Sequence, residues 1–136
     1  ALPIWPQSLV KAKENFRTLL DQTDCYLEFH DLTDADHFQK ELRQTDLLVN
    51  ATSVGMDGES LPISIDTRFP KELLVADIIY QPFETPFLAL ARKQEIEAVN
   101  GLGMLLYQAA GAFKLWTGEN MPTGAIWQEL ENIYNS

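Results

Sequence analysis

Residues 96–118 read IEAVNGLGMLLYQAAGAFKLWTG. The segment opens with a short apolar stretch, Ile96–Val99, that is typical of a buried strand. After the turn Asn100-Gly101, apolar residues recur at helical spacing from Leu102 to Thr117, and Gly118 then suits a helix C-cap. A strand followed at once by an amphipathic helix is the repeating unit of a parallel sheet covered by helices. The segment therefore predicts an α/β fold.

The same alternation of strands and helices covers the rest of the chain. The predicted strands are Ala1–Trp5, Cys25–His30, Asp46–Asn50, Leu73–Ile79 and Ile96–Val99. The predicted helices are Ser8 to about Leu20, Thr33 to about Gln44, Thr85 or Pro86 to about Lys93, Leu102–Thr117 and about Gly124–Tyr134. Pro3 weakens the first strand, and a long loop runs from Ala51 to about Pro70. Asp46–Asn50 is nearly all apolar, as expected for a strand buried on both faces.

Length, charge and cysteine content exclude several classes of protein. A chain of 136 residues suits one core, and its formal net charge of −10 disfavours nucleic acid and anionic membranes as partners. The single cysteine, Cys25, cannot form an internal disulfide, and no Cys or His motif has a zinc spacing. No apolar run is long enough to span a membrane, and the opening residues do not resemble a signal peptide. We therefore expect a cytoplasmic protein.

The helix predicted at Leu102–Thr117 has two distinct faces. One face is an apolar stripe that we expect to pack on the sheet; it consists of Leu102, Leu106, Ala109, Phe113 and Trp116. A second face carries Gly101, Met104, Gln108 and Gly111. Small residues, a thioether and an amide at a helix N-terminus suit contact with a ligand or another domain. The alternative is that Met104 fills a gap in the core and the glycines allow close packing.

Other chemical motifs are weak or absent. No G-x-G-x-x-G motif occurs, because Leu106 stands where Gly101-Leu102-Gly103 would need its third glycine. The acidic residues around Asp31 and Asp34 suit a helix N-terminus, so no metal site is predicted. His30 and His37 have no serine or cysteine motif around them, which disfavours a nucleophilic triad.

Three segments carry a family resemblance. They are DLLVNATSVGM at residues 46–56, VADIIYQP at 75–82 with TPFL at 85–88, and NGLGMLLYQAA at 100–110 followed by Phe113, Trp116-Thr117-Gly118 and Met121-Pro122. In this order and spacing they resemble the shikimate and quinate dehydrogenase family. The resemblance runs from about residue 46 to the end and, more faintly, back to the first strand. Residues 23–34 look closer to the quinate/shikimate branch than to the strictly shikimate-specific one.

The resemblance implies a fold, an activity and a set of site residues. Family members reduce 3-dehydroshikimate or its quinate analogue with a nicotinamide cofactor held on a Rossmann-like domain. By resemblance, the cofactor would be lined by Asn50, Ala51, Thr52, Ile78, Gly101 and Met104, the last three beside the nicotinamide. Tyr80 and Gln108 would reach the substrate. The helix face that groups Gly101, Met104 and Gln108 agrees with this assignment.

The chain also departs from the family pattern. A family member has an N-terminal domain with a catalytic Lys/Asp pair, and a first Rossmann strand with a glycine-rich turn; neither precedes Ala1 in this sequence. We therefore expect one incomplete cofactor domain, residues 1–136, with residues 119–136 as a C-terminal helical extension. We expect this chain alone to hold no catalytic residue and to bind the cofactor weakly or not at all. An unpaired gap between its strands predicts that a missing N-terminal segment or a homodimer fills it.

Two alternatives stay open at this point. The cofactor is NADP or NAD, because Pro6-Gln7-Ser8 follows the first strand where NADP-dependent relatives tend to carry an arginine, and lysines occur only later, at Lys11 and Lys13. The function is that of a shikimate or quinate dehydrogenase, or that of an inactive binding module that keeps the fold. An unrelated flavodoxin-like domain would explain the alternation of elements but not the three segments.

Overall fold

The computed structural model describes residues 2–4, 11, 14–17, 21–24 and 26–135. The chain divides into two compact units, an N-terminal unit, Ala1–Gln44, and a C-terminal unit, Thr45–Ser136.

Among its described residues, the N-terminal unit has a pair of parallel strands and a helix after them, besides short helical stretches between the two strands. Strand β1 (Leu2–Ile4) pairs with β2 (Phe29–Asp31), and helix α2 (Ala35–Leu42) follows. The helix begins at residue 35 because the Asp34 carboxylate accepts the His37 backbone N–H at 3.0 Å. The helix predicted from Ser8 lies partly outside the described residues, although residues 14–17 and 21–22 are helical. The first predicted strand is confirmed over Leu2–Ile4. The second, predicted for Cys25–His30, is shorter and shifted to Phe29–Asp31, because residues 26–28 are not in a strand; Cys25 lies outside the described residues.

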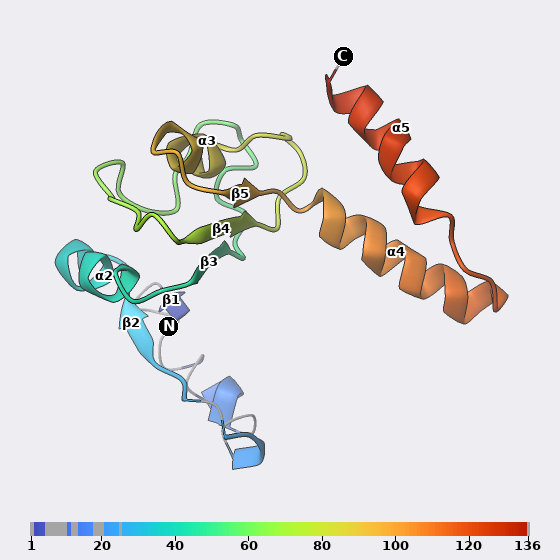
Figure 1. Ribbon diagram of the computed structural model, residues 1–136. Coiled ribbons are helices and arrows are strands. Elements are labelled where there is room, and N and C mark those ends of the chain that lie inside the picture. The colour runs from blue at the N-terminus through green and yellow to red at the C-terminus, as the bar shows by residue number, and fades with distance from the viewer. Residues whose placement is uncertain (1, 5–10, 12–13, 18–20, 25, 136) are drawn as a thin grey trace. The chain divides into compact units, whose positions relative to one another are not determined.

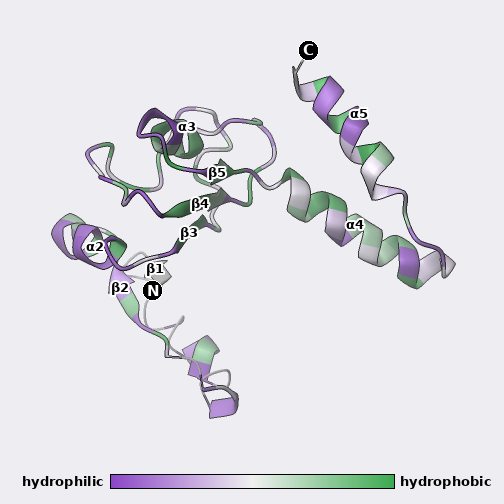
Figure 2. Cartoon of the chain, in the orientation of Figure 1, coloured by the Kyte–Doolittle hydropathy of each residue, from purple (hydrophilic) through white to green (hydrophobic). Residues whose placement is uncertain are grey.

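The C-terminal unit holds a parallel sheet of order β3-β4-β5, made of β3 (Leu47–Asn50), β4 (Leu74–Asp77) and β5 (Ala98–Val99) (Figure 1). Helix α3 (Pro86–Lys93) packs on β4 and β5. Figure 2 shows the three strands in the green of apolar residues. The core gathers side chains that are almost completely buried, namely Leu73, Val75, Phe87, Leu88 and Ala91. The α/β class predicted from residues 96–118 is confirmed.

Strand β3 is more exposed than its apolar sequence predicts. Leu47 is 52% exposed and Val49 is 41% exposed, whereas Asn50 is buried. The prediction of a strand buried on both faces is therefore wrong. The reason is that, among the described residues, β3 stands at one end of the strand order β3-β4-β5, and the main contacts of α3 are with β4 and β5.

Two helices follow β5. Helix α4 (Leu102–Thr117) ends at Gly118, which has a φ of 79°, and α5 (Thr123–Asn135) contacts α4. Leu102 and Leu106 are buried as predicted, but Trp116 is 83% exposed, so the apolar stripe is buried only near its start. A 16-residue helix is roughly 24 Å long and extends past strands of two to four residues. No helix in the described ranges combines the length and apolar character needed to cross a membrane.

Thr85 is both the N-cap of α3 and a link to β4. Its hydroxyl accepts the Leu88 N–H at 3.3 Å and donates to Asp77 at 2.7 Å, and the side chain is fully buried. We expect Thr85→Ala to lower the free energy of unfolding by about 2 kcal/mol, because both hydrogen bonds are lost. Thr85→Ser keeps the hydroxyl and should lose less than about 1 kcal/mol. Urea denaturation of both variants measures the difference, and equal losses would contradict a role for the hydroxyl.

Candidate functional site

A buried hydrogen-bond network joins the carboxyl ends of β3 and β4. Asp77, 3% exposed, accepts hydrogen bonds from Asn50 Nδ2 at 3.1 Å, the Ile79 N–H at 3.0 Å and Thr85 Oγ1 at 2.7 Å. The side-chain oxygen Oδ1 of Asn50 accepts from the Thr52 N–H and hydroxyl, at 3.2 and 2.7 Å. In the register of the sheet, Asn50 lies opposite Asp77. The network therefore fixes how the chain leaves both strands.

The first cavity, which we name the β3–β4 cavity, lies where the chain leaves these strands. Its volume is about 620 Å³, and it is lined by Ala51, Thr52, Ser53, Met56, Ile78, Ile79, Tyr80 and Gln81. Tyr80 is 42% exposed. The residues contribute hydroxyl and amide groups on an otherwise apolar surface, which suits a small polar ligand.

The loop beside Met56 is held by a carboxylate. Asp57 accepts hydrogen bonds from the Ser60 hydroxyl, from the Ser60 N–H at 2.8 Å and from the Glu59 N–H at 3.0 Å. These bonds lower the pKa of Asp57 to about 2, the Ser60 hydroxyl contributing most. Because the pKa is lowered in the folded protein, the ionised Asp57 contributes to folding stability. This contribution is fully present above the ordinary aspartate pKa and is lost as the pH falls through about 2.

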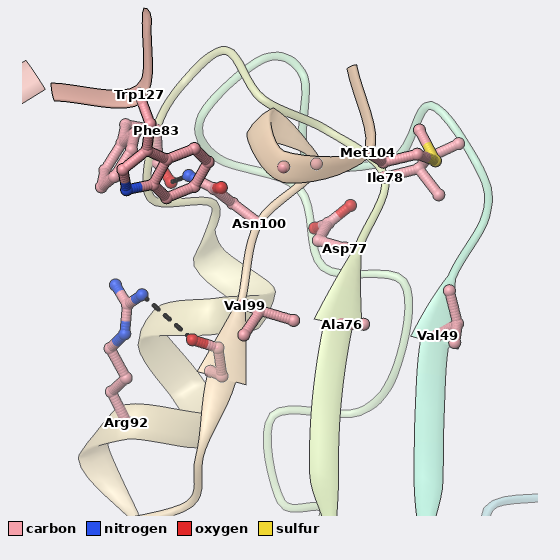
Figure 3. A pocket seen from close by; sticks show the side chains of 13 residues that line it. Val49, Ala76, Asp77, Ile78, Phe83, Arg92, Val99, Asn100, Met104 and Trp127 are labelled. Atoms are coloured by element: carbon pink, nitrogen blue, oxygen red, sulfur yellow. Dashed lines mark hydrogen bonds between the residues drawn. The ribbon is translucent and has the colours of Figure 1, made fainter. Parts of the chain in front are cut away.

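The second cavity, which we name the β5–α4 cavity, has a volume of about 530 Å³. Figure 3 shows its side chains around the carboxyl ends of β4 and β5. The lining is mainly apolar and consists of Val49, Ala76, Asp77, Ile78, Phe83, Arg92, Ala98, Val99, Asn100, Gly101, Gly103, Met104 and Trp127. Arg92 donates to the Ala98 carbonyl oxygen at 3.3 Å, and Asn100 donates to the Phe83 carbonyl oxygen at 3.0 Å. These two bonds hold the rim of the cavity in place.

Gly101 brings the start of α4 against the end of β4. Its N–H donates to the Ile79 carbonyl oxygen at 3.0 Å. A Cβ atom at this position would lie 1.9 Å from the Ile78 carbonyl oxygen and 2.4 Å from its carbon. Only glycine allows this approach, which places the first turn of α4 beside Ile78.

Comparison with known proteins identifies the family. The family model of the shikimate 5'-dehydrogenase C-terminal domain matches residues 101–131. Over 127 residues, the chain is 53% identical to the shikimate dehydrogenase (NADP(+)) of Streptococcus sanguinis. The aligned stretch covers 93% of this chain and 45% of that protein. The chain belongs to the shikimate dehydrogenase family. It matches the C-terminal half of these dehydrogenases and spans about 45% of the length of this curated relative.

Solved structures of the family confirm the fold. The shikimate 5-dehydrogenase of Listeria monocytogenes, in complex with shikimate and NAD, gives a TM-score of 0.79 at 36% identity, over 89% of this chain and 43% of that one. The enzyme of Thermus thermophilus, in complex with NADP(H) and shikimate, gives a TM-score of 0.66 at 32% identity, over 88% and 40% of the two chains. The Rossmann-like architecture expected from the resemblance is therefore confirmed.

The site residues expected for a shikimate dehydrogenase fall into three groups. Ala51, Thr52 and Tyr80 line the β3–β4 cavity, whereas Gly101 and Met104 line the β5–α4 cavity. Ile78 lines both cavities and so connects the two groups.

The third group lines neither of the two cavities. Asn50 is buried in the network beneath the loops, and Gln108 is exposed on α4. For the helix face that carries Gly101, Met104, Gln108 and Gly111, the alternative was that Met104 fills a core gap and the glycines allow close packing. Met104 is 53% exposed, so it does not fill a core gap, but Gly101 does serve close packing.

Three residues that shape the site are not among the expected site residues. Asp77 anchors the network, Arg92 lies at the rim of the β5–α4 cavity, and Trp127 reaches the same cavity from α5. The sequence signal for Asp77 is its position at the carboxyl end of an otherwise apolar strand, the edge at which parallel sheets bind ligands. No comparable signal marks Trp127, because its place at the cavity depends on how α5 packs against α4.

Proposed function

We propose that this chain is the cofactor-binding, C-terminal part of a shikimate or quinate dehydrogenase. The reaction is hydride transfer between NADP or NAD and the 3-keto group of dehydroshikimate or dehydroquinate. Besides family membership, the observation that carries the proposal is that Ile78 lines two adjoining cavities, a mainly apolar one and one with hydroxyl and amide groups. A flat cofactor ring and a polyhydroxylated acid need surfaces of these two kinds.

The residues of the β5–α4 cavity fit a nicotinamide ring. Ile78, Val99 and Met104 offer apolar contacts, and Gly101 has no side chain that would occupy the space. The volume of about 530 Å³ lies within the range of small-molecule sites. The reduced cofactor, when bound, would supply the hydride. The role of these residues is to hold the ring in one orientation and to exclude water from its face.

On the substrate side, we assign Tyr80 and Gln108 to the hydroxyl and carboxylate groups. The Tyr80 phenol lines the β3–β4 cavity and is 42% exposed, so it can donate to or accept from a ligand. Gln108 lies on α4 four residues, about one turn, after Met104, and its amide is exposed to solvent. Thr52 already bonds Asn50, so we assign it the positioning of the loop.

The cofactor is NADP or NAD. The relatives include an enzyme named for NADP(+) and a structure in complex with NAD. Of the residues expected to distinguish the two cofactors, Pro6, Gln7 and Ser8 lie outside the described part of the chain. Comparing kcat/KM for the two cofactors in the full-length enzyme decides between them.

Two variants of the full-length enzyme test the substrate assignment. We expect Tyr80→Phe and Gln108→Ala each to lower kcat/KM for shikimate about 10- to 100-fold, because each removes a hydrogen bond to a polar or charged substrate group, worth about 1–3 kcal/mol. The matched controls are Tyr107→Phe, on the exposed side of α4, and Gln128→Ala on α5. Both controls should keep the wild-type value.

The outcome also separates the dehydrogenase from an inactive binding module. Full-length protein that turns over neither shikimate nor quinate with either cofactor would overturn the proposed reaction. Activity that is unchanged in Tyr80→Phe and Gln108→Ala would leave the reaction in place and remove these two residues from the substrate site.

A further inference from the structure

Four side chains with metal-ligating groups meet in the N-terminal unit, apart from the residues of the proposed dehydrogenase site. Glu28 and His30 lie two residues apart where the chain enters β2. His37 and Glu41 lie four residues apart on α2, which places them one turn apart on one face of that helix. Strand and helix therefore each contribute one imidazole and one carboxylate.

The atoms of this cluster converge. His30 Nε2 lies 3.2 Å from Glu28 Oε2, and one ligand atom each of Glu28, His30 and Glu41 lies within 4.8 Å of the other two. All three residues are half-buried. Two ligands about 2.0–2.1 Å from a shared tetrahedral zinc ion lie roughly 3.3–3.5 Å apart, so small side-chain adjustments would bring the three atoms to that geometry.

We propose that Glu28, His30 and Glu41 bind one Zn²⁺ ion, with water as the fourth ligand. One imidazole with two carboxylates is a donor set that suits zinc and related first-row transition ions. Calcium and magnesium prefer sites of six or more oxygen ligands and are poorly matched to it. The two carboxylates and the chain's formal net charge of −10 also favour a cation.

Neighbouring residues orient His30 and Glu28. His37 Nε2 lies 2.7 Å from His30 Nδ1, and the Tyr26 hydroxyl donates to Glu28 Oε1 at 2.7 Å. A metal ion on His30 Nε2 needs a lone pair there, so the ring proton moves to Nδ1 and is donated to His37. The Tyr26 bond leaves Glu28 Oε2 to face the metal. Such outer partners are the usual companions of metal-bound histidine and carboxylate groups.

Because Glu28 and His30 belong to the β2 segment and Glu41 to α2, a bound ion would cross-link strand and helix. We infer that zinc stabilises this part of the fold, independently of the dehydrogenase reaction.

Zinc binding by the 136-residue chain tests the proposal. Calorimetry with zinc chloride, on a Cys25→Ser background that removes the one thiol, should give one site per chain with a micromolar dissociation constant. We expect His30→Gln and Glu41→Gln each to weaken binding at least tenfold, and His37→Gln to weaken it about tenfold. Glu72→Gln, an exposed carboxylate in the C-terminal unit, changes the net charge as Glu41→Gln does and should bind as the parent does.

Two further measurements distinguish the loss of a metal ligand from the loss of the fold. Circular dichroism without metal establishes that each variant is folded, and Co²⁺ should give intense visible bands of a four-coordinate site in the parent but not in Glu41→Gln. If His30→Gln fails to fold, Glu41→Gln decides the outcome. Binding of equal strength in Glu41→Gln and Glu72→Gln, or no one-to-one binding by the parent, would overturn the site.

Discussion

Gly101→Ala is expected to lower the free energy of unfolding by at least about 3 kcal/mol, or to prevent folding of the C-terminal unit altogether. The added Cβ would lie 1.9 Å from the Ile78 carbonyl oxygen, which is backbone of the β4 end and has no alternative rotamer. To relieve the clash, the chain must separate the turn before α4 from Ile78. That movement breaks the hydrogen bond from Gly101 to Ile79 and opens the β5–α4 cavity.

Gly111→Ala is the matched control for this substitution. Gly111 lies in the middle of α4, and a Cβ there would meet no atom within 4 Å. Alanine should therefore raise the free energy of unfolding by up to about 1 kcal/mol, the difference in helix propensity between the two residues. Thermal and urea denaturation measure both variants. Equal stability of Gly101→Ala and Gly111→Ala would show that the close approach of Gly101 to Ile78 is not required.

Asp77→Ala is expected to lower the free energy of unfolding by about 3–4 kcal/mol, since it leaves several buried donors without an acceptor. The carboxylate accepts from Asn50, Thr85 and the Ile79 N–H, and it is 3% exposed. These losses share one network and are not additive. In the full-length enzyme we expect kcat/KM to fall as well, because the loops after β3 and β4 lose their common anchor.

Two further variants distinguish the loss of the hydrogen-bond network from the general effect of removing a negative charge on stability. Asp77→Asn keeps one carbonyl oxygen as acceptor, so it should retain about half of the stability that Asp77→Ala loses. Asp66→Ala removes an exposed carboxylate and should change stability by less than about 0.5 kcal/mol. Urea denaturation ranks the three variants. An Asp77→Ala protein as stable as Asp66→Ala would rule out the anchoring role.

The order and type of the elements could be predicted from the sequence because local physics decides them. Thr85 caps α3 and Pro86 occupies its first position, while Gly118 ends α4 in the left-handed conformation. The motif segments likewise indicated the family, which the comparisons confirm. The face that groups Gly101 with Met104 follows from helix geometry alone, and both residues line one cavity.

Only the tertiary structure determines which side chains are buried and which side chains from distant segments lie close together. An apolar strand such as β3 reads as buried, but its exposure depends on which neighbours cover it, and Leu47 is half exposed. Helix periodicity assigned Trp116 to the packed face of α4, yet the helix extends beyond the sheet and leaves it 83% exposed. The meeting of Glu28 with Glu41 has no local signature, because the two belong to separate segments. Periodicity and caps are properties of neighbouring residues, whereas burial and shared ligand geometry depend on how distant segments pack.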